Sequence, residues 1–163
     1  MPAAPVEDED TKAAVVTFCL ALPALNAALP GGIHDGPLPS PTTRPYGRIT
    51  CTQGPRPNMM HAPVRAGSGY HDFRKVTVTI TGIKAAVVTA LGLLRGRLEW
   101  QPRDTTDASG NVSKPMTLPN ATLIMVSPLP GSPLKEPEKT SAQGDVFCNG
   151  IAEYEVLTGR NVT

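Results

Sequence analysis

The sequence predicts an α+β fold in which a mostly antiparallel sheet of about four strands carries two main helices on one face. Residues 73–82, FRKVTVTITG, alternate apolar and polar side chains as a half-buried strand does. The residues that follow place apolar side chains three or four positions apart, as an amphipathic helix does. Further strand-like segments lie on both sides of this pair, separated by stretches rich in proline and glycine. Together these patterns indicate helices packed against one face of a sheet.

The composition bounds the size and class of the protein. A length of 163 residues is typical of one domain, so we expect residues 1–163 to form a single domain with a mobile start at residues 1–9. Fifteen Lys and Arg residues against fourteen Asp and Glu residues give a net charge of +1, which argues against a broad nucleic-acid or membrane-binding surface. No run approaches the roughly 18 apolar residues of a membrane span, and the N-terminal segment is acidic where a signal peptide is basic. We expect a soluble, unexported protein with long loops.

The first helix is predicted after the acidic start, with Asp10 or Thr11 as its N-cap. Its predicted apolar face consists of Val15, Val16, Cys19, Leu20 and Leu22. Pro23 interrupts this helix but suits a first helical position, so residues 23–29 are predicted to form a separate short turn that ends at residues 30–32, PGG. The helix is therefore predicted to bend or break at Pro23.

A short strand and a long loop are predicted next. Residues 31–45 have loop composition, and residues 46–52, YGRITCT, alternate as a strand. Residues 53–72 contain three prolines, three glycines and no periodicity, so we predict a functional or disordered loop there. This loop is the first candidate for a partner contact.

The long strand is predicted to turn Val76, Val78 and Ile80 toward the core and a face of threonines toward solvent or a partner. Gly82 is predicted to end the strand. The helix after it is predicted to bury the stripe formed by Ile83, Val87, Leu91, Leu94 and Leu98. That helix would cover the apolar face of the sheet.

The last third of the chain is predicted as loop, strand, loop and strand. Residues 101–120 and 128–143 are predicted as polar loops, and residues 121–127 between them as a buried strand. The closing strand, within residues 145–160, is predicted to alternate Val146, Cys148, Ala152, Tyr154 and Val156 with polar positions. Gly150 is predicted to mark a bulge or bend in it.

The sequence indicates neither a catalytic nor a metal site. The histidines, His34, His61 and His71, lack metal-ligand spacing and lie in loop-like segments, where we interpret them as solvated. The cysteines, Cys19, Cys51 and Cys148, are far apart and form no CxxC pair, so we predict small buried apolar residues. We therefore predict no enzyme activity and no cofactor.

Charged residues also lack a catalytic pattern. The acidic segments VEDED and KEPEK are interpreted as solvated charge. Arg56, Arg65, Arg74 and Lys75 gather in and after the first long loop, but four basic residues among few aromatic ones make a weak nucleic-acid footprint. A protein interface or a solubilising surface explains them better.

The order of these pieces resembles the tail terminator, or tail completion, proteins of long-tailed bacteriophages. The resemblance rests on LPALNAALPGGIHDGPLP after the first helix, RPYGRITCT, the strand and helix in RKVTVTITGIKAAVVTALGLLRGRL, and the closing DVFCNGIAEYEVLTGR. It covers most of the chain as a match of pattern and element order. The three long loops look longer and richer in proline than is usual in that family.

The resemblance implies a structural virion protein at the head-proximal end of the tail, present in the host cytoplasm during assembly. Such proteins form a ring, typically a hexamer, that binds the last ring of tail-tube subunits, stops tube growth and offers a surface to the head-tail connector. It implies no catalysis, no membrane partner and no specific nucleic-acid binding.

Residues for the partner contact are predicted from their types and their place. The first long loop supplies Arg56, Met59, Met60, Arg65 and Tyr70, because Met, Arg and Tyr are favoured at protein interfaces. Thr77 and Thr79, on the polar face of the long strand, are the further candidates.

Two alternatives stay open from the sequence. One is a tail-tube or head-tail connector subunit, whose pattern is hard to separate from that of a terminator. The other is a small ligand-binding domain or enzyme whose polar residues converge only in three dimensions.

Overall fold

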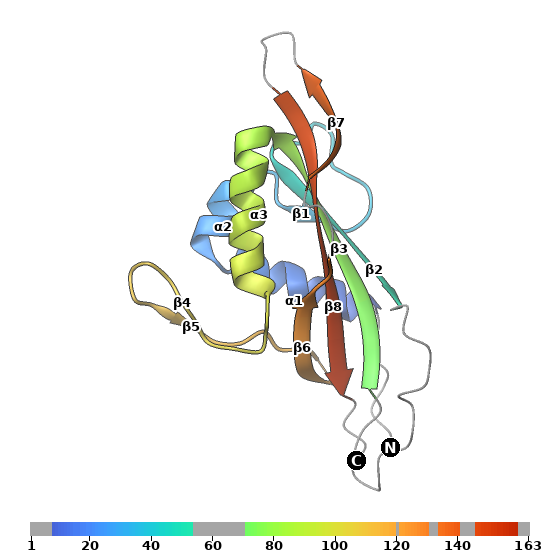
Figure 1. Ribbon diagram of the computed structural model, residues 1–163, viewed down its shortest axis with the longest axis vertical. Coiled ribbons are helices and arrows are strands. Elements are labelled where there is room, and N and C mark those ends of the chain that lie inside the picture. Colours follow the sequence, from blue (N-terminus) through green and yellow to red (C-terminus); the bar gives the residue numbers. More distant parts are fainter. Residues whose placement is uncertain (1–7, 54–70, 120, 131–133, 141–145, 160–163) are drawn as a thin grey trace, which may run out of the picture.

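The computed structural model describes residues 8–53, 71–119, 121–130, 134–140 and 146–159 (Figure 1). Their helices are α1 (Asp8–Leu20), α2 (Pro23–Ala28) and α3 (Lys84–Leu98). Their strands are β1 (Ile33–His34), β2 (Tyr46–Gln53), β3 (His71–Ile83), β4 (Thr105–Thr106), β5 (Val112–Ser113), β6 (Thr122–Pro128), β7 (Leu134–Thr140) and β8 (Val146–Gly159). The predicted α+β class is confirmed.

The described strands form one large sheet and one small hairpin. The large sheet has the order β1-β2-β3-β8-β6, and β7 pairs with β8 as well. Every pair in it is antiparallel except β1 with β2, which is parallel. β3 and β8 form the centre, paired from His71↔Gly159 to Ile83↔Phe147. β4 and β5 pair only with each other.

The helices lie on one face of the large sheet (Figure 1). α3 packs against β8 and β3, α1 packs against β2, and α2 contacts α3. The sheet turns Val76, Val78 and Ile80 toward them, each at most 1% exposed, as the alternation predicted. Each such side chain contributes roughly 1.5–3 kcal/mol by leaving water, so this inner face holds the fold together.

α1 and α2 form as two helices because proline separates them. Pro23 occupies the first turn of α2, as predicted, and the NH of Leu29 closes that helix on the carbonyl oxygen of Leu25. The expected N-caps, Asp10 and Thr11, were wrong: α1 already includes Asp8, and Thr11 is fully buried within it. Three acidic residues in the first turn of α1 favour a helix that begins there.

The junction of β3 and α3 differs from the prediction by one residue. Gly82 does not end the strand, which continues to Ile83, and α3 starts at Lys84. Gly82 is required for another reason, because a Cβ atom there would lie 2.8 Å from the Cβ of Pro45. Ile83 caps the helix and is 42% exposed, so its predicted place in the buried stripe was wrong. The rest of the stripe is confirmed: Val87, Leu91, Leu94 and Leu98 are buried.

Gly150 marks a close helix contact and not a bulge. It pairs with Ile80 in unbroken register between β3 and β8. A Cβ atom on Gly150 would lie 2.5 Å from Cδ1 of Leu91 and 2.6 Å from Cγ1 of Val87. The absence of a side chain lets α3 approach β8, which is the physical reason for glycine here.

Several segments predicted as loops form strands. Gln53, His71 and Asp72 extend β2 and β3; the remainder of that predicted loop, residues 54–70, lies outside the described residues. Ile33–His34 pairs beside β2, Leu134–Thr140 pairs beside β8, and the segment 101–120 contains the β4–β5 hairpin. The sheet is therefore wider than the predicted four strands.

β6 and the segment before it reverse two burial expectations. β6 was predicted to be buried, and its Leu123 and Val126 are, but Ile124 and Met125 are each 39% exposed, because a register shift between Leu123 and Met125 disturbs the pairing with β8. The segment before β6 was predicted to be a polar loop, yet Gln101 and Met116 in it are at most 2% exposed. Among the described residues, no helix is long and apolar enough to cross a membrane.

Candidate partner interface

The face of the sheet opposite the helices is largely polar, and we call it the outer face. Its described residues are Tyr46, Arg48, Thr50 and Thr52 of β2, Phe73, Lys75, Thr77, Thr79 and Thr81 of β3, and Asn149, Ile151, Glu153, Glu155 and Leu157 of β8. They share one face because the strands are in register and side chains alternate along each strand. Thr77 and Thr79 are partly exposed there.

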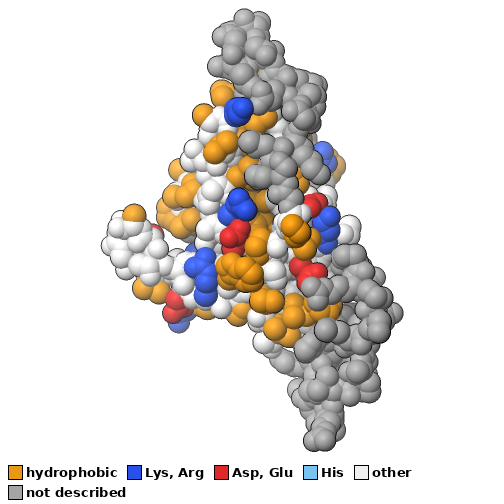
Figure 2. Space-filling view, viewed as in Figure 1, with side chains coloured by type: hydrophobic (Ala, Val, Ile, Leu, Met, Phe, Trp, Pro, Cys, Tyr) orange, Lys and Arg blue, Asp and Glu red, His pale blue; other side chains and the backbone are white. Residues whose placement is uncertain are grey.

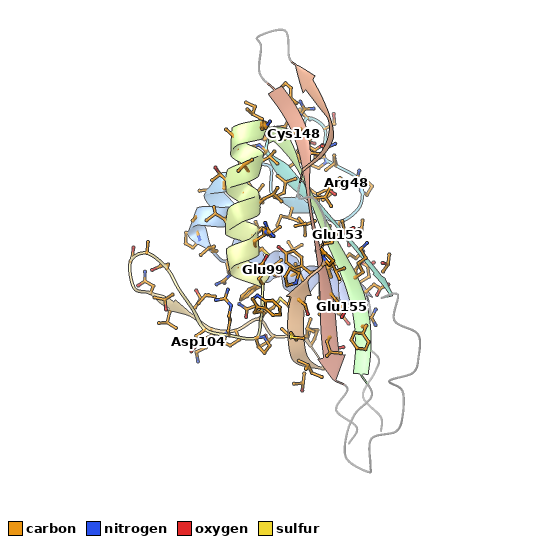
Figure 3. All side chains as sticks on the ribbon, in the orientation of Figure 1. Arg48, Glu99, Asp104, Cys148, Glu153 and Glu155 are labelled. Carbon is orange, nitrogen blue, oxygen red and sulfur yellow. The ribbon has the colours of Figure 1, made fainter. Side chains whose placement is uncertain are left out.

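Side chains on the outer face bond to one another across strands. Lys75 Nζ lies 2.8 Å from Glu153 Oε1, and Thr81 Oγ1 donates to Asn149 Oδ1 at 2.8 Å. Figure 3 shows Glu153 and Glu155 along β8. Glu155 is only 8% exposed, so this middle part of the outer face is less accessible than the end that carries Thr79. The cross-strand pairs fix the side chains but add little stability at such exposure.

One end of the outer face is hollowed into a basic concavity of about 470 Å³. Its described lining consists of Arg44, Tyr46, Arg48, Thr79, Thr81, Phe147, Cys148 and Asn149. The Arg44 guanidinium stacks 5.1 Å from the centre of the Phe147 ring, and Arg48 donates to the carbonyl oxygen of Gly36 at 3.5 Å. We call it the basic concavity, because its described lining includes two arginines and no acidic residue.

Apolar side chains are exposed at the β6 edge of the sheet. These side chains are Trp100, which is 57% exposed, and Ile124 and Met125, which lie at the register shift in β6. The backbone NH of Trp100 donates to the carbonyl oxygen of Val126 at 2.8 Å, which holds Trp100 beside β6. Trp and Met are enriched at protein interfaces, so this edge is a second place for a protein contact.

A second hollow, of about 560 Å³, lies between α1 and the segment before β6. Its lining is mostly apolar and includes Ala14 and Phe18 of α1, Ala21 just after that helix, and the residues from Pro115 to Pro119. Asp10 is the one charged residue among the described lining residues. Its chemistry suits packing and offers little for catalysis.

Residues 103–114 form an arm that stands clear of the body (Figures 1 and 2). Most of it is exposed, and Val112 is 62% exposed. At its base, Arg103 donates to the carbonyl oxygens of Glu99 at 3.0 Å and Gly96 at 2.7 Å. Gln101, fully buried, accepts from the backbone NH of Met116 at 3.2 Å. These bonds fix where the arm leaves the body.

Arg97 of α3 joins the arm to α1. Its Nε donates to the carbonyl oxygen of Phe18 at 3.1 Å, its guanidinium lies 3.8 Å from the centre of the Phe18 ring, and Nη1 donates to Thr105 Oγ1 at 3.0 Å. Burial lowers the pKa of Arg97 below its usual value. α1 has no basic residue in its last turn, so Arg97 supplies the positive charge and the hydrogen bond that the helix end needs.

Two cysteines and one aspartate have surroundings that favour structural roles. Burial raises the pKa of Cys19 and of Cys51 to about 12, so both thiols stay protonated and unreactive at neutral pH. Asp8, expected to be solvated, instead pairs with Arg74. Within the described ranges, no group of three or more His, Cys, Asp or Glu residues is placed to hold a metal ion.

The structure describes only two of the residues predicted for the partner contact. Thr77 and Thr79 lie on the outer face, whereas Arg56, Met59, Met60, Arg65 and Tyr70 lie outside the described residues. His34, expected in a loop, lies in β1 and its Nε2 is 2.5 Å from the carbonyl oxygen of Gly31. Arg44, Arg48 and Arg97 were not among the residues predicted from the sequence. Arg44 lies just before the predicted strand at residues 46–52 and Arg48 lies within it, and these two basic residues were the available signal for the basic concavity.

Comparison with known proteins shows that this chain has the fold of a chain in a solved virion structure. No family model matches the chain, and no curated protein matches it. A solved structure, described as the virion of a native gene transfer agent (GTA) particle, contains a chain with a TM-score of 0.60 and 13% sequence identity to this one. The alignment covers 93% of this chain and 96% of that chain. The protein therefore shares its fold, over nearly its whole length, with a chain of that virion.

Proposed function

We propose that this protein is a structural virion protein that caps the tail tube as a ring, ends tail elongation and offers the surface to which the head attaches. The observation that carries the virion role is the fold shared with the gene transfer agent virion over 93% of this chain. The capping role is supported by the similarity of the sequence pattern to tail terminator proteins. Its place would be the head-proximal end of the tail, with the tail-tube and connector proteins as partners.

The surfaces of the molecule suit assembly. A subunit of a closed ring needs two different surfaces for its two neighbours, and further surfaces for the tube and the connector. The outer face, the exposed apolar edge at β6 and the arm supply distinct surfaces of this kind. Several of the described charged residues form ion pairs within the fold, such as Arg74–Asp8 and Lys75–Glu153. These features support a protein without catalytic activity.

The tube or connector contact is assigned, as part of this proposal, to the loop that carries Arg56 and Arg65 and to Thr77 and Thr79 on the outer face. Arginine, methionine and tyrosine in a loop fit a protein partner that is bound at a late stage of assembly. Reversing both loop arginines to glutamate is expected to abolish capping and leave the fold intact. Unchanged capping would remove the loop from the interface.

The experiment that tests the proposal measures what the purified protein assembles into. Light scattering over a concentration series gives the mass, and negative-stain micrographs of the same samples give the shape. We expect discrete closed rings, or monomers that form rings when tail tubes are added. Open-ended cylinders would instead assign the chain to the tail tube, and monomers that ignore tubes at every concentration would contradict a virion assembly role.

A further inference from the structure

We propose that the arm of one subunit docks in the basic concavity of a second copy of this chain, as the head-to-tail contact of the assembly. This inference rests on the proposed function in one respect, namely that the chain assembles with itself. It adds the two surfaces that meet and the charges that select them.

The arm is held in one conformation before it binds. Its turn is closed by Asp107, whose carboxylate accepts hydrogen bonds from the backbone NH of Ser109 at 2.9 Å and of Asn111 at 2.8 Å, and from the side-chain amide of Asn111 at 3.0 Å. Its base is fixed by Arg97 and Arg103. A preorganised element loses little conformational entropy on binding, which favours docking.

The distal part of the arm, residues 104–113, is acidic, whereas Arg103 and Lys114 lie at its base. Residues 104–113, DTTDASGNVS, contain Asp104 and Asp107 and no Lys or Arg, which gives a charge of −2. Both aspartates are exposed. The hydrogen bonds of Asp107 lower the pKa of its carboxyl, led by those from Asn111, so the tip stays negatively charged down to acidic pH. The distal part of the arm thus carries a fixed negative charge away from the body, and the two basic residues stay at the base.

The basic concavity has the complementary chemistry. Arg44 and Arg48 are exposed at its rim, and the hydroxyl groups of Tyr46, Thr79 and Thr81 line it. Arginine can bind a carboxylate with two parallel hydrogen bonds, and hydroxyl groups can serve the backbone of a turn. A short acidic hairpin is an occupant that matches both the charge and the polar lining.

The two surfaces lie on opposite sides of the molecule. Figure 3 shows Asp104 beside the arm, on the helix side, and Arg48 across the sheet on the outer side. A contact between two different patches repeats from subunit to subunit, and it closes into a ring when the rotation between subunits permits. This placement favours a second copy over a contact within one chain.

The test reverses each charge and then mixes the two variants. One variant carries Arg44→Glu and Arg48→Glu; the other carries Asp104→Lys and Ala108→Lys, which leaves the hydrogen bonds of Asp107 in place. Each variant alone sets like charges against each other, so we expect its dissociation constant for self-association to rise on the order of tenfold or more. In an equal mixture, every contact between unlike variants again joins opposite charges, so assembly should return.

Conservative variants at the same positions serve as controls. Arg44→Lys with Arg48→Lys and Asp104→Glu keep the charges and should assemble nearly as the wild type does. Light scattering measures the mass of every sample at low and high salt, and circular dichroism checks that each variant is folded. Salt should weaken wild-type assembly, because exposed charges are screened.

The outcomes separate this contact from the proposed capping role. Loss of assembly in each variant and its return in the mixture would support the contact, even if the assemblies were open tubes, which would contradict capping alone. Rings that form equally well in both charge-reversed variants would overturn the contact and leave the capping role standing. A wild type that stays monomeric at all concentrations would also overturn it. Should a double variant fail to fold, Arg48→Glu and Asp104→Lys alone carry the same test.

Discussion

Arg97 shows how one buried charge can organise several elements at the residue scale. It is 5% exposed, and it reaches the end of α1 through the Phe18 carbonyl oxygen and the arm through Thr105. The final carbonyl groups of a helix have no partner within the helix, and a positive charge near them is favourable. Arg97 thus contributes from α3 what the sequence of α1 lacks.

Replacing Arg97 by methionine should destabilise the protein by about 2–3 kcal/mol, because it removes the ring contact and leaves the Phe18 carbonyl without its donor. Arg95 is the matched control on the same helix. Its side chain is 52% exposed and pairs with Glu99 at 3.1 Å, so Arg95→Met should cost less than about 1 kcal/mol. Urea unfolding measures both, and equal losses would show that Arg97 is an ordinary surface charge.

A second residue-scale prediction concerns pH. Asp35 Oδ1 lies 2.8 Å from Lys12 Nζ of α1, and this hydrogen bond lowers the pKa of Asp35 below the ordinary 3.8. A carboxyl whose pKa is lower in the folded state contributes stability above its unfolded pKa and loses it as pH falls through the folded pKa. Asp35→Asn should therefore be less stable than the wild type at pH 7, and the difference should shrink as the pH falls below 3.8 and vanish once it is below the lowered pKa of the folded state.

Thermal unfolding of both proteins at several pH values measures this difference. The sign follows from the lowered pKa, since only the unfolded carboxyl takes up a proton at first as the pH falls. A difference that is the same at neutral and strongly acidic pH would assign the effect of the substitution to something other than the charge of Asp35.

At the scale of elements, α3 packs closely against β8 because Gly150 has no side chain between them. Gly150→Ala should destabilise the protein by about 1–3 kcal/mol, because the new methyl group would meet Val87 and Leu91 in a packed core. Gly92→Ala in α3 is the control, since a Cβ there meets nothing within 4 Å. It should stabilise the helix by roughly 0.5–1 kcal/mol. Denaturant unfolding decides, and a neutral Gly150→Ala would show that α3 can move away from the sheet without loss.

The elements that the sequence predicted are those whose stability is decided locally or by one periodic face. β3 and α3 were predicted within one or two residues because strict alternation and a helical stripe adjoin in the sequence. β7 was missed because LKEPEKT has a proline and no apolar alternation. It forms a strand by pairing with β8, a partner that the local sequence does not reveal.

The candidate interface was less predictable than the fold. The place of Thr77 and Thr79 on the polar face of the sheet could be predicted, because their spacing puts them opposite the core side chains, whereas their contact with a partner stays a prediction. The basic concavity joins Arg44 and Arg48 to Phe147 and Asn149, about a hundred residues apart in the chain, and only the β2-β3-β8 order brings them together. The buried place of Arg97 was equally hidden, since its partners Phe18 and Thr105 lie on other elements.

At the scale of the whole molecule, our proposal of an assembly role rests on the shared fold and on the exposed surfaces. The shared fold with a gene transfer agent virion chain extends over nearly the whole of both chains, although only 13% of the residues are identical. Core positions tolerate such divergence when their size and pattern are kept, whereas surfaces change with their partners. The arm, the basic concavity and the apolar β6 edge are therefore the places where the role of this protein is to be tested.

The most direct test of that role locates the protein in the assembled particle. Antibody-bound gold, directed against this chain and viewed by electron microscopy, would mark its position on intact particles and on isolated tails. Our proposal predicts label at a single site, the end of the tail tube that meets the head. Label spread along the tube would contradict the capping role and identify a tube subunit, and particles without label would contradict a place in the virion.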